Sequence, residues 1–311
     1  MDLNTSFSGD DNLYVRLRSG NGDPAVFGSK SYGTYLSSDS SKYSDILEVD
    51  KIWYTFPVGD SNTIWIGPKI ENYYMHATAP SIYKPVLKQF ALGGNGAAYG
   101  ASTKAGAGWA YKADNGFAVS SNVVTGNNGL LTNQQATSWA TQVGYTQPQY
   151  SASLMINQKY NGWEDGYYST TKGHYRLLDG STSTQQSANS TNYGLRAWWR
   201  PADSGTATPE VSVGYDYSVL DGYDTNDTTD AFFVGLTWLD IFNADDRIGI
   251  ALGQPQMREN TGAEPFMWEA YYGFKVNDSV TVTPAIFGAS NANGSDGEDY
   301  TGAVIETQFK F

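Results

Sequence analysis

The sequence contains no cysteine, which excludes a disulfide-stabilised scaffold and any metal site built on thiolates. Histidine is almost absent too, because only His76 and His174 occur, too few for a multi-histidine zinc site. Positive charge is scarce: 19 Lys and Arg stand against 32 Asp and Glu in 311 residues, a formal net charge of −13. Proteins that bind nucleic acid need a basic surface. We therefore expect no metal, no cofactor and no nucleic-acid partner.

Long apolar runs are missing as well. A membrane-spanning helix needs about 20 consecutive apolar residues, and the best run here, 232–239, ends at Asp240. Residues 1–11 are too polar for the apolar core of a secretory signal. An exported protein loses that signal, so we expect the chain to be a mature or trimmed product.

Charged residues make up only 16% of the chain, against about 25% in an ordinary soluble domain. Aromatic residues, by contrast, reach 14%, and there are 34 glycines. Low charge with many aromatics and glycines suits a β-barrel that stands between lipid and water.

Apolar residues recur at every second position in segments of about ten residues, which is the pattern of half-buried strands. In residues 210–218, for example, Val211, Val213 and Tyr215 alternate with polar or small residues. We predict fifteen strands, at 2–8, 12–19, 46–56, 62–70, 104–113, 117–124, 137–146, 150–160, 191–200, 209–218, 230–239, 246–254, 265–275, 279–287 and 300–311.

Short turns alternate with long Gly-, Ser-, Asn- and Asp-rich stretches along the chain, which is typical of an up-and-down transmembrane barrel. The whole chain, 1–311, is thus predicted to be one antiparallel barrel domain. Such barrels have an even number of strands, so we expect sixteen, with one missing upstream of Met1 unless a strand here is split or overlooked. The apolar positions of strand 46–56 change face midway, and a β-bulge near Lys51 would reconcile them.

The two ends of the chain carry a family resemblance. Residues 300–311, YTGAVIETQFKF, form an alternating strand that ends in an aromatic residue, like the C-terminal signal of bacterial outer-membrane barrels. Together with the opening DLNTSFSGDDNLYVRLRSGN and the rest of the closing segment from Phe266, it resembles the porin domain of cyanobacterial major outer-membrane porins, within the carbohydrate-selective porin family. Members usually carry a signal peptide, an S-layer-homology domain and a coiled coil before the barrel, none of which is present in this sequence.

This resemblance implies a channel in the cell outer membrane, surrounded by lipid and lipopolysaccharide and assembled as a homotrimer. Inorganic ions and small hydrophilic solutes would diffuse through it. One alternative is a carbohydrate-selective channel, in which lumen aromatics stack on sugar rings. Another, of a different class, is a barrel enzyme or structural anchor without an open pore. The candidate sugar-stacking residues are Tyr14, Trp65, Trp198 and Tyr271, and the candidate interfacial girdle residues are Trp199, Tyr217, Trp238 and Tyr272.

Charge is divided unevenly between strands and loops. The predicted polar strand faces hold nine basic and six acidic residues, whereas the rest of the chain holds 10 basic and 26 acidic ones. Arg16 and Arg18 lie two positions apart, and Arg196 and Arg200 four apart, so each pair shares a face. Arginine toward lipid costs about 2–4 kcal/mol at the membrane midplane, which favours the lumen. These side chains either set ion selectivity or only solvate the lumen and pair with one another.

The long connection 71–103 is less polar than the others. Tyr83, Val86, Leu87 and Phe90 give it an apolar side. We expect it to fold inward and narrow the channel, the alternative being an extracellular cap or a trimer contact. The candidate pore-lining and selectivity residues are Arg16, Arg18, Lys69, Glu71, Lys84, Lys88, Arg196, Arg200, Arg247, Glu269 and Lys275.

Catalysis has little support in the sequence. His76 and His174 lie in loops beside Ser or Thr, but no nucleophile motif accompanies them, so surface histidines are the simpler interpretation. The acidic stretch 224–230 resembles a calcium loop only weakly, because it lacks the glycine and the distal glutamate of that motif. We expect no catalytic residue and no enzyme activity.

Overall fold

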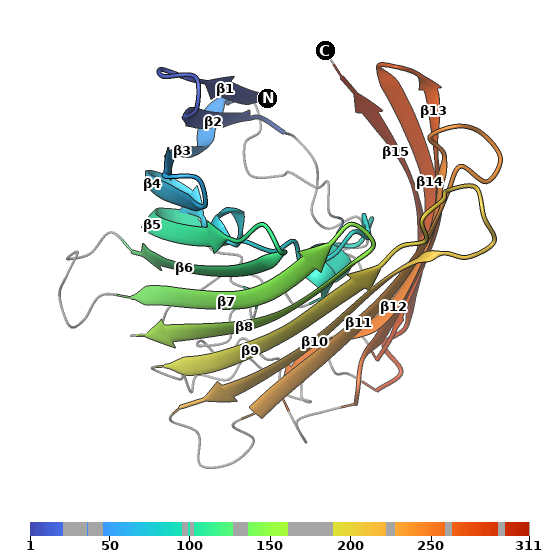
Figure 1. Cartoon of the computed structure of the whole chain (residues 1–311). Helices are drawn as coiled ribbons and strands as arrows, with labels where there is room; N and C mark the ends of the chain where they lie inside the picture. Colours follow the sequence, from blue (N-terminus) through green and yellow to red (C-terminus); the bar gives the residue numbers. More distant parts are fainter. Residues whose placement is uncertain are drawn as a thin grey trace.

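The computed structural model describes residues 1–20, 36, 46–94, 99, 103–126, 136–160, 189–221, 228–258, 263–291 and 296–310, with only the backbone described at 256–258. Fifteen strands form a single antiparallel sheet in which each strand pairs with its neighbours in sequence (Figure 1). The strands are β1 (Asp2–Thr5), β2 (Asn12–Arg18), β3 (Glu48–Val58), β4 (Asn62–Glu71), β5 (Thr103–Lys112), β6 (Phe117–Thr125), β7 (Thr137–Gln147), β8 (Tyr150–Tyr160), β9 (Ser190–Trp199), β10 (Glu210–Leu220), β11 (Thr228–Leu239), β12 (Arg247–Arg258), β13 (Phe266–Asn277), β14 (Val280–Ser290) and β15 (Tyr300–Phe309).

All fifteen predicted strands are thus confirmed, most of them to within two residues at each end. Two short 3-10 helices, η1 (Asn72–Met75) and η2 (Lys88–Gly93), interrupt the connection between β4 and β5. No helix among the described residues is long and apolar enough to cross a membrane.

The sheet curls around a hollow, and its first and last strands face each other across an open side (Figure 1). Within the described residues β1 pairs only with β2, and β15 only with β14. The barrel is therefore not closed, and the predicted sixteenth strand remains a prediction. We call the end of the sheet with short connections the turn end and the opposite end the loop end.

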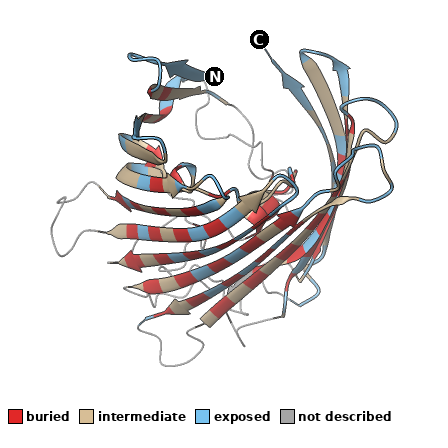
Figure 2. Cartoon of the chain, in the orientation of Figure 1, coloured by how far each residue is buried: buried red, intermediate tan, exposed pale blue. Residues whose placement is uncertain are grey.

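Burial alternates residue by residue along the strands, so one face of the sheet is covered and the other exposed (Figure 2). In β9, Leu195 and Trp199 on the outer face are exposed, whereas Asn192 and Arg196 on the inner face are buried. A water-soluble sheet would show the opposite arrangement, with apolar side chains covered. An apolar outer face is what a barrel in contact with lipid requires.

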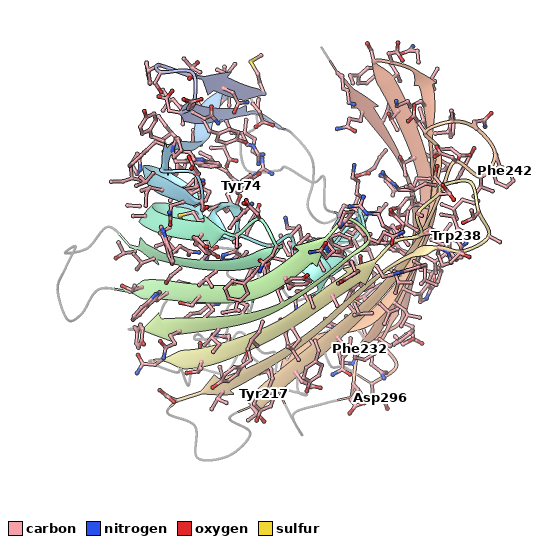
Figure 3. All side chains as sticks on the ribbon, viewed as in Figure 1. Tyr74, Tyr217, Phe232, Trp238, Phe242 and Asp296 are labelled. Carbon is pink, nitrogen blue, oxygen red and sulfur yellow. The ribbon has the colours of Figure 1, made fainter. Side chains whose placement is uncertain are left out.

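The predicted girdle residues lie near strand ends. Trp199, Trp238 and Tyr272 are at the turn end, and Tyr217 is toward the loop end. Figure 3 shows Trp238 and Tyr217 at these opposite ends of the sheet. This spacing suits aromatic side chains at the two interfaces of a membrane.

The expected bulge in β3 is present. Arg16 pairs with Lys51 and Leu17 pairs with Val49, so Asp50 is the extra residue. Asp50 and Lys51 are both buried on the inner side, which leaves the apolar residues before and after the bulge free to share the outer face.

Two turns at the turn end share one construction. Their sequences follow the pattern Phe-x-x-Asp-Asp, at 7–11 and 242–246. The carboxylate of Asp11 accepts the amides of Phe7 and Ser8, and that of Asp246 accepts the amides of residues 241–243. Because these hydrogen bonds and those from nearby hydroxyls stabilise the ionised form, the pKa of each carboxyl lies below its usual range.

Leu195→Arg tests the outward face. Leu195 lies in the middle of β9, so a charge there should lower the free energy of unfolding in lipid vesicles by about 2–4 kcal/mol. The control is Thr283→Arg, on the inner face opposite Glu306, which should lower it far less. Denaturant titration of folded protein measures both, and equal losses would contradict the assignment of faces.

Candidate functional site

Residues 72–94, which we call the inward segment, lie inside the curled sheet, along its inner face. The segment begins against β5, where the side chain of Met75 packs so closely on Gly108 that an added Cβ would lie 2.6 Å from the sulfur. It ends against β10, where Gly93 and Gly214 bring their backbones together. Figure 3 shows Tyr74 of this segment within the hollow. The inward fold expected for this connection is therefore present for its described part.

Side chains of the inner wall bind the backbone of the inward segment. Amide groups of a loop inside a barrel have no strand to pair with, and leaving them unpaired is costly. In this chain, polar side chains from separate strands supply the acceptors. Three such hydrogen bonds are Ala77 N to Ser120 Oγ (3.0 Å), Thr78 N to Gln142 Oε1 (2.8 Å) and Ile82 N to Ser212 Oγ (3.2 Å).

Glu269 of β13 is the strongest of these anchors. Its Oε1 accepts the Tyr83 hydroxyl (2.8 Å) and the Val86 amide (3.1 Å), and its Oε2 accepts the Leu87 amide (2.6 Å). The side chain has no solvent-exposed area. The prediction that Glu269 lines the pore is therefore wrong, because the inward segment covers it.

Arg196 of β9 anchors the other end of the segment. Its guanidinium forms a bidentate ion pair with Asp216 (2.9 and 3.0 Å) and donates through Nε to the carbonyl of Leu92 (2.8 Å). It also lies over the ring of Tyr99, 5.0 Å from the centroid. The side chains of Arg196 and Asp216 are each 1% exposed. Arg196 therefore does not line the pore as predicted, and its role is to hold the segment.

The apolar side of the inward segment packs on the wall as its sequence predicts. Tyr83, Leu87 and Phe90 are buried in one cluster with Phe233 and Tyr271 of the sheet. Tyr83 contacts both wall rings, at centroid distances of 5.5 and 5.9 Å. Tyr271 is consequently covered and not open for stacking on a sugar.

The other proposed sugar-stacking residues are also mostly covered. Trp198 is buried, and Trp65 is half-buried. Tyr14 is buried against Trp53, with the two rings stacked at 4.1 Å. Tyr74 of the inward segment lies beside this pair and is more exposed, although the sequence did not single it out.

Four basic side chains gather beside the segment near the loop end. Arg16, Arg18, Lys51 and Lys88 line a recess of about 390 Å³, which we call the basic recess. Its acidic members are Asp2, Asp50 and Glu71. The basic residues come from β2, β3 and η2, so the inward fold of the segment is what brings Lys88 to the recess.

Ion pairs link most of the charged side chains that line the basic recess. Arg16 Nε lies 2.7 Å from Asp2, and its Nη2 donates to the Tyr74 hydroxyl at 3.0 Å. Lys51 contacts the carboxylate of Glu71. Glu71 therefore lines the basic recess as the partner of a buried lysine that the sequence did not single out, and its place in the pore stays a prediction.

A second basic group lies toward the turn end. Lys84 of the inward segment is exposed, and the nearby cations Arg247 and Lys310, together with burial, lower its pKa. Arg247 begins β12, and Glu210 begins β10 beside it. The segment therefore carries Lys84 toward one group of charges and Lys88 toward the other.

Three remaining candidates lie at the margins of the sheet. Lys69 donates to the Val49 carbonyl at the loop end (2.6 Å). Arg200 follows the last residue of β9 and donates to the Pro148 carbonyl in a turn (2.9 Å), so it does not continue the strand with Arg196 as expected. Lys275 pairs with Asp245 of another turn (2.8 Å).

His76 is not a surface histidine, contrary to the prediction. Its Nδ1 is 3.1 Å from Asn122 Nδ2 and its Nε2 is 3.2 Å from the Tyr99 carbonyl. These partners assign a neutral ring that accepts at Nδ1 and donates at Nε2. Burial lowers the pKa of His76 to about 4. His174 and the acidic residues at 224–227 lie outside the described residues.

Glu269→Ala should release the middle of the inward segment. Each buried amide left without an acceptor costs about 1–3 kcal/mol, so the amides of Val86 and Leu87 should exchange faster with deuterium. Hydrogen–deuterium exchange read by mass spectrometry measures this on peptides spanning 82–90. The control is Glu306→Ala, a neighbouring strand carboxylate that makes none of these bonds. Unchanged exchange in the Glu269 variant would refute the anchor.

Acidification should loosen the structure through His76. The folded pKa of about 4 lies below the ordinary value of 6.5, so the unfolded chain binds more protons between these values. Stability from this group is complete above pH 6.5 and is lost as the pH falls to 4. In His76→Gln this contribution should vanish, which denaturant titrations across that range can measure. An identical pH dependence in parent and variant would contradict it.

Comparisons with known proteins agree with the architecture. No family model matches the chain. A curated relative, the uncharacterized protein alr4550 of Nostoc sp. (strain PCC 7120), is 23% identical over 354 aligned residues. The alignment covers all of this chain, which spans 60% of the length of that relative.

Several solved structures share the fold. OprB of Pseudomonas putida superposes with a TM-score of 0.69 at 13% identity, over 97% of this chain and 83% of that one. The anion-selective porin from Comamonas acidovorans gives 0.63 at 10% identity, over 99% and 87%. The outer-membrane channel DcaP of Acinetobacter baumannii gives 0.55 at 11%, over 99% and 83%. The chain therefore has the β-barrel fold of outer-membrane porins and channels.

Proposed function

We propose that the chain forms a water-filled channel in the outer membrane, through which inorganic ions and small hydrophilic solutes diffuse. The observation that carries this proposal is the inward segment, which crosses the interior while charged side chains remain beside it near both ends of the sheet. A barrel of this size leaves an aqueous interior, and a segment inside it narrows the passage. The fold shared with outer-membrane porins supports the same function.

The selectivity residues in this proposal are fewer than the sequence suggested. We assign selectivity to Arg16, Arg18, Lys84 and Lys88. The first two line the basic recess with Lys88, and Lys84 is exposed on the inward segment near Arg247. Arg196 and Glu269 instead hold the segment in place. Permeating ions would meet the basic recess and the Lys84 group in succession, and cations in a pore raise the local concentration of anions.

The family resemblance extends the proposal to partners and location. We infer a homotrimer surrounded by outer-membrane lipid and lipopolysaccharide, without a cofactor and without enzyme activity. The exposed apolar outer face supports the lipid contact. A monomeric mass in mild detergent would contradict the trimer.

A carbohydrate-selective channel is the second candidate, favoured by one aromatic group. Tyr74 is partly exposed beside Trp53 and Tyr14, with ring centroids 4.9 and 6.1 Å away. Such a surface can stack on a sugar ring. Sugars would then compete with the ion current, whereas a simple ion channel would be insensitive to them.

Planar-bilayer recordings test the channel and its selectivity together. The parent should insert with stepwise conductance, and Lys84→Gln with Lys88→Gln should shift the reversal potential under a salt gradient toward cation permeability. The control is Lys112→Gln with Lys275→Gln, which removes two positive charges at the turn end. Absence of conductance from folded parent protein would refute the channel. Conductance with an unchanged reversal potential in the double variant would refute the selectivity residues alone.

A further inference from the structure

We propose that two turns at the turn end are membrane anchors, whose phenylalanine side chains insert into the lipid interface on the periplasmic side of the outer membrane. The turns are residues 7–11 and 242–246, which we call the first and second anchor turns. The short turns of outer-membrane barrels face the periplasm, so the lipids are those of the periplasmic leaflet. The inference concerns how the barrel is held in the membrane and does not depend on which solute crosses it.

Each anchor turn exposes one large apolar side chain. Phe7 is 73% exposed and Phe242 is 71% exposed, while the other residues of both turns are Ser, Gly, Asn, Ala or Asp. Single exposed apolar side chains are common on proteins, so exposure alone does not identify a surface for a partner. The evidence is the construction around each ring, which is the same in both turns.

The first anchor turn holds its ring against the outer face of the sheet. The ring centroid of Phe7 is 6.2 Å from that of Tyr54, and Tyr54 is 5.6 Å from Phe56. Tyr54 and Phe56 alternate in β3 with the buried inner-face residue Trp53, so both rings lie on the outer face. The Tyr54 hydroxyl donates to the carboxylate of Asp11, which closes the turn. Phe7 thus extends a row of lipid-facing rings.

The second anchor turn repeats this arrangement ten strands further along the sheet. The ring of Phe242 is 5.9 Å from that of Tyr272, and Tyr272 is 5.6 Å from Phe274. Both partners alternate in β13 with buried inner-face residues such as Tyr271. The Tyr272 hydroxyl donates to Asp246 at 3.0 Å. Figure 3 shows Phe242 beside the sheet at the turn end.

The aspartate at the end of each turn determines where the ring points. Asp11 accepts the amide of Phe7 (2.9 Å), and Asp246 accepts the amide of Phe242 (3.0 Å). Each carboxylate also accepts a tyrosine hydroxyl of the outer face, so it ties the backbone of the phenylalanine to the aromatic residues of the wall. The ring is therefore directed toward the outer face and not toward the lumen.

Lipid is the partner that this continuity favours. The rings that the two phenylalanines touch belong to the apolar outer face, and aromatic side chains at the ends of barrel strands lie at the membrane interface. A phenylalanine attached to that band gains free energy when its ring leaves water. The two turns join β1 to β2 and β11 to β12, so the barrel is held at two places on its circumference, which opposes tilting.

Site-directed spin labelling tests the anchors directly, because the chain has no cysteine and a nitroxide attaches only where one is introduced. Phe7→Cys and Phe242→Cys are labelled and folded into vesicles of phosphatidylethanolamine and phosphatidylglycerol. Collisions with oxygen, which concentrates in lipid, are compared with collisions with a nickel chelate, which stays in water. Leu195→Cys is the lipid-facing reference. Ser204→Cys is the water-facing reference, since Ser204 lines a recess with the inner-face residue Thr237.

The ratio of oxygen to nickel collisions should be several-fold higher at both phenylalanine positions than at Ser204, and close to the Leu195 value. A ratio equal to that at Ser204 would overturn the proposal, because the ring would then lie in water. Few collisions with either reagent would overturn it too, because the position would then be covered by another protein or by a second copy of the chain.

A second measurement tests whether the turn directs the ring. In Asp246→Ala the collision ratio of a label at Phe242 should fall toward the Ser204 value, whereas a label at Phe7 should keep its ratio in the same background. Heat-modifiable migration in electrophoresis establishes that the variant is folded, and Tyr272→Phe, which removes only the hydroxyl, serves if it is not. An unchanged ratio at Phe242 would refute the anchor construction. Neither measurement involves conductance, so both results stand whether or not the barrel is an open channel.

Discussion

The need to pair backbone amides inside the barrel governs the rest of this structure. A segment that leaves the sheet and crosses its interior loses every ladder partner, and where it packs against the wall its amides are shielded from water. This chain places acceptors on the wall at the required heights, and the carboxylate of Glu269 alone receives three donors from residues 83–87. The path of the inward segment is thus determined by the polar side chains of five strands.

This constraint divides the charged wall residues into two kinds. Arg196 with Asp216, and Glu269 on its own, are covered by the segment and satisfied by it. Arg16, Arg18 and their neighbours line the basic recess instead. Both kinds occupy the same face of the sheet with the same alternation. The two kinds differ in whether the inward segment packs over them. That packing decides which charged side chains a solute could meet.

Sequence reasoning recovered the sheet because its signals are local. Alternation with period two marks each strand, and the face change around Lys51 was enough to predict the bulge. The apolar side of residues 83–90 likewise predicted burial of that segment. All three depend on side-chain spacing over a few residues, which a single sequence displays directly.

The same reasoning failed for residues whose role depends on distant partners. Spacing assigns Arg196 and Glu269 to the inner face, but it carries no information on which loop covers them. Lys51 was overlooked because the bulge turns it inward against the regular alternation. His76 appeared exposed because loops usually are, whereas its partner Asn122 is 46 residues away. One signal was available in hindsight, namely the low polarity of the connection that carries His76.

The bond between Leu87 and Glu269 also has a consequence for how the chain folds. Every strand pairs with its neighbour in sequence, so the sheet itself can grow hairpin by hairpin through short loop closures. The inward segment instead contacts a residue 182 positions later in the chain. That contact can form only when β13 has curled round to meet the segment, so the segment must already lie on the concave side at that moment. Residues 77 and 78 can bond to β6 and β7 earlier, but the middle of the segment is seated only when the curl of the sheet brings β13 to it.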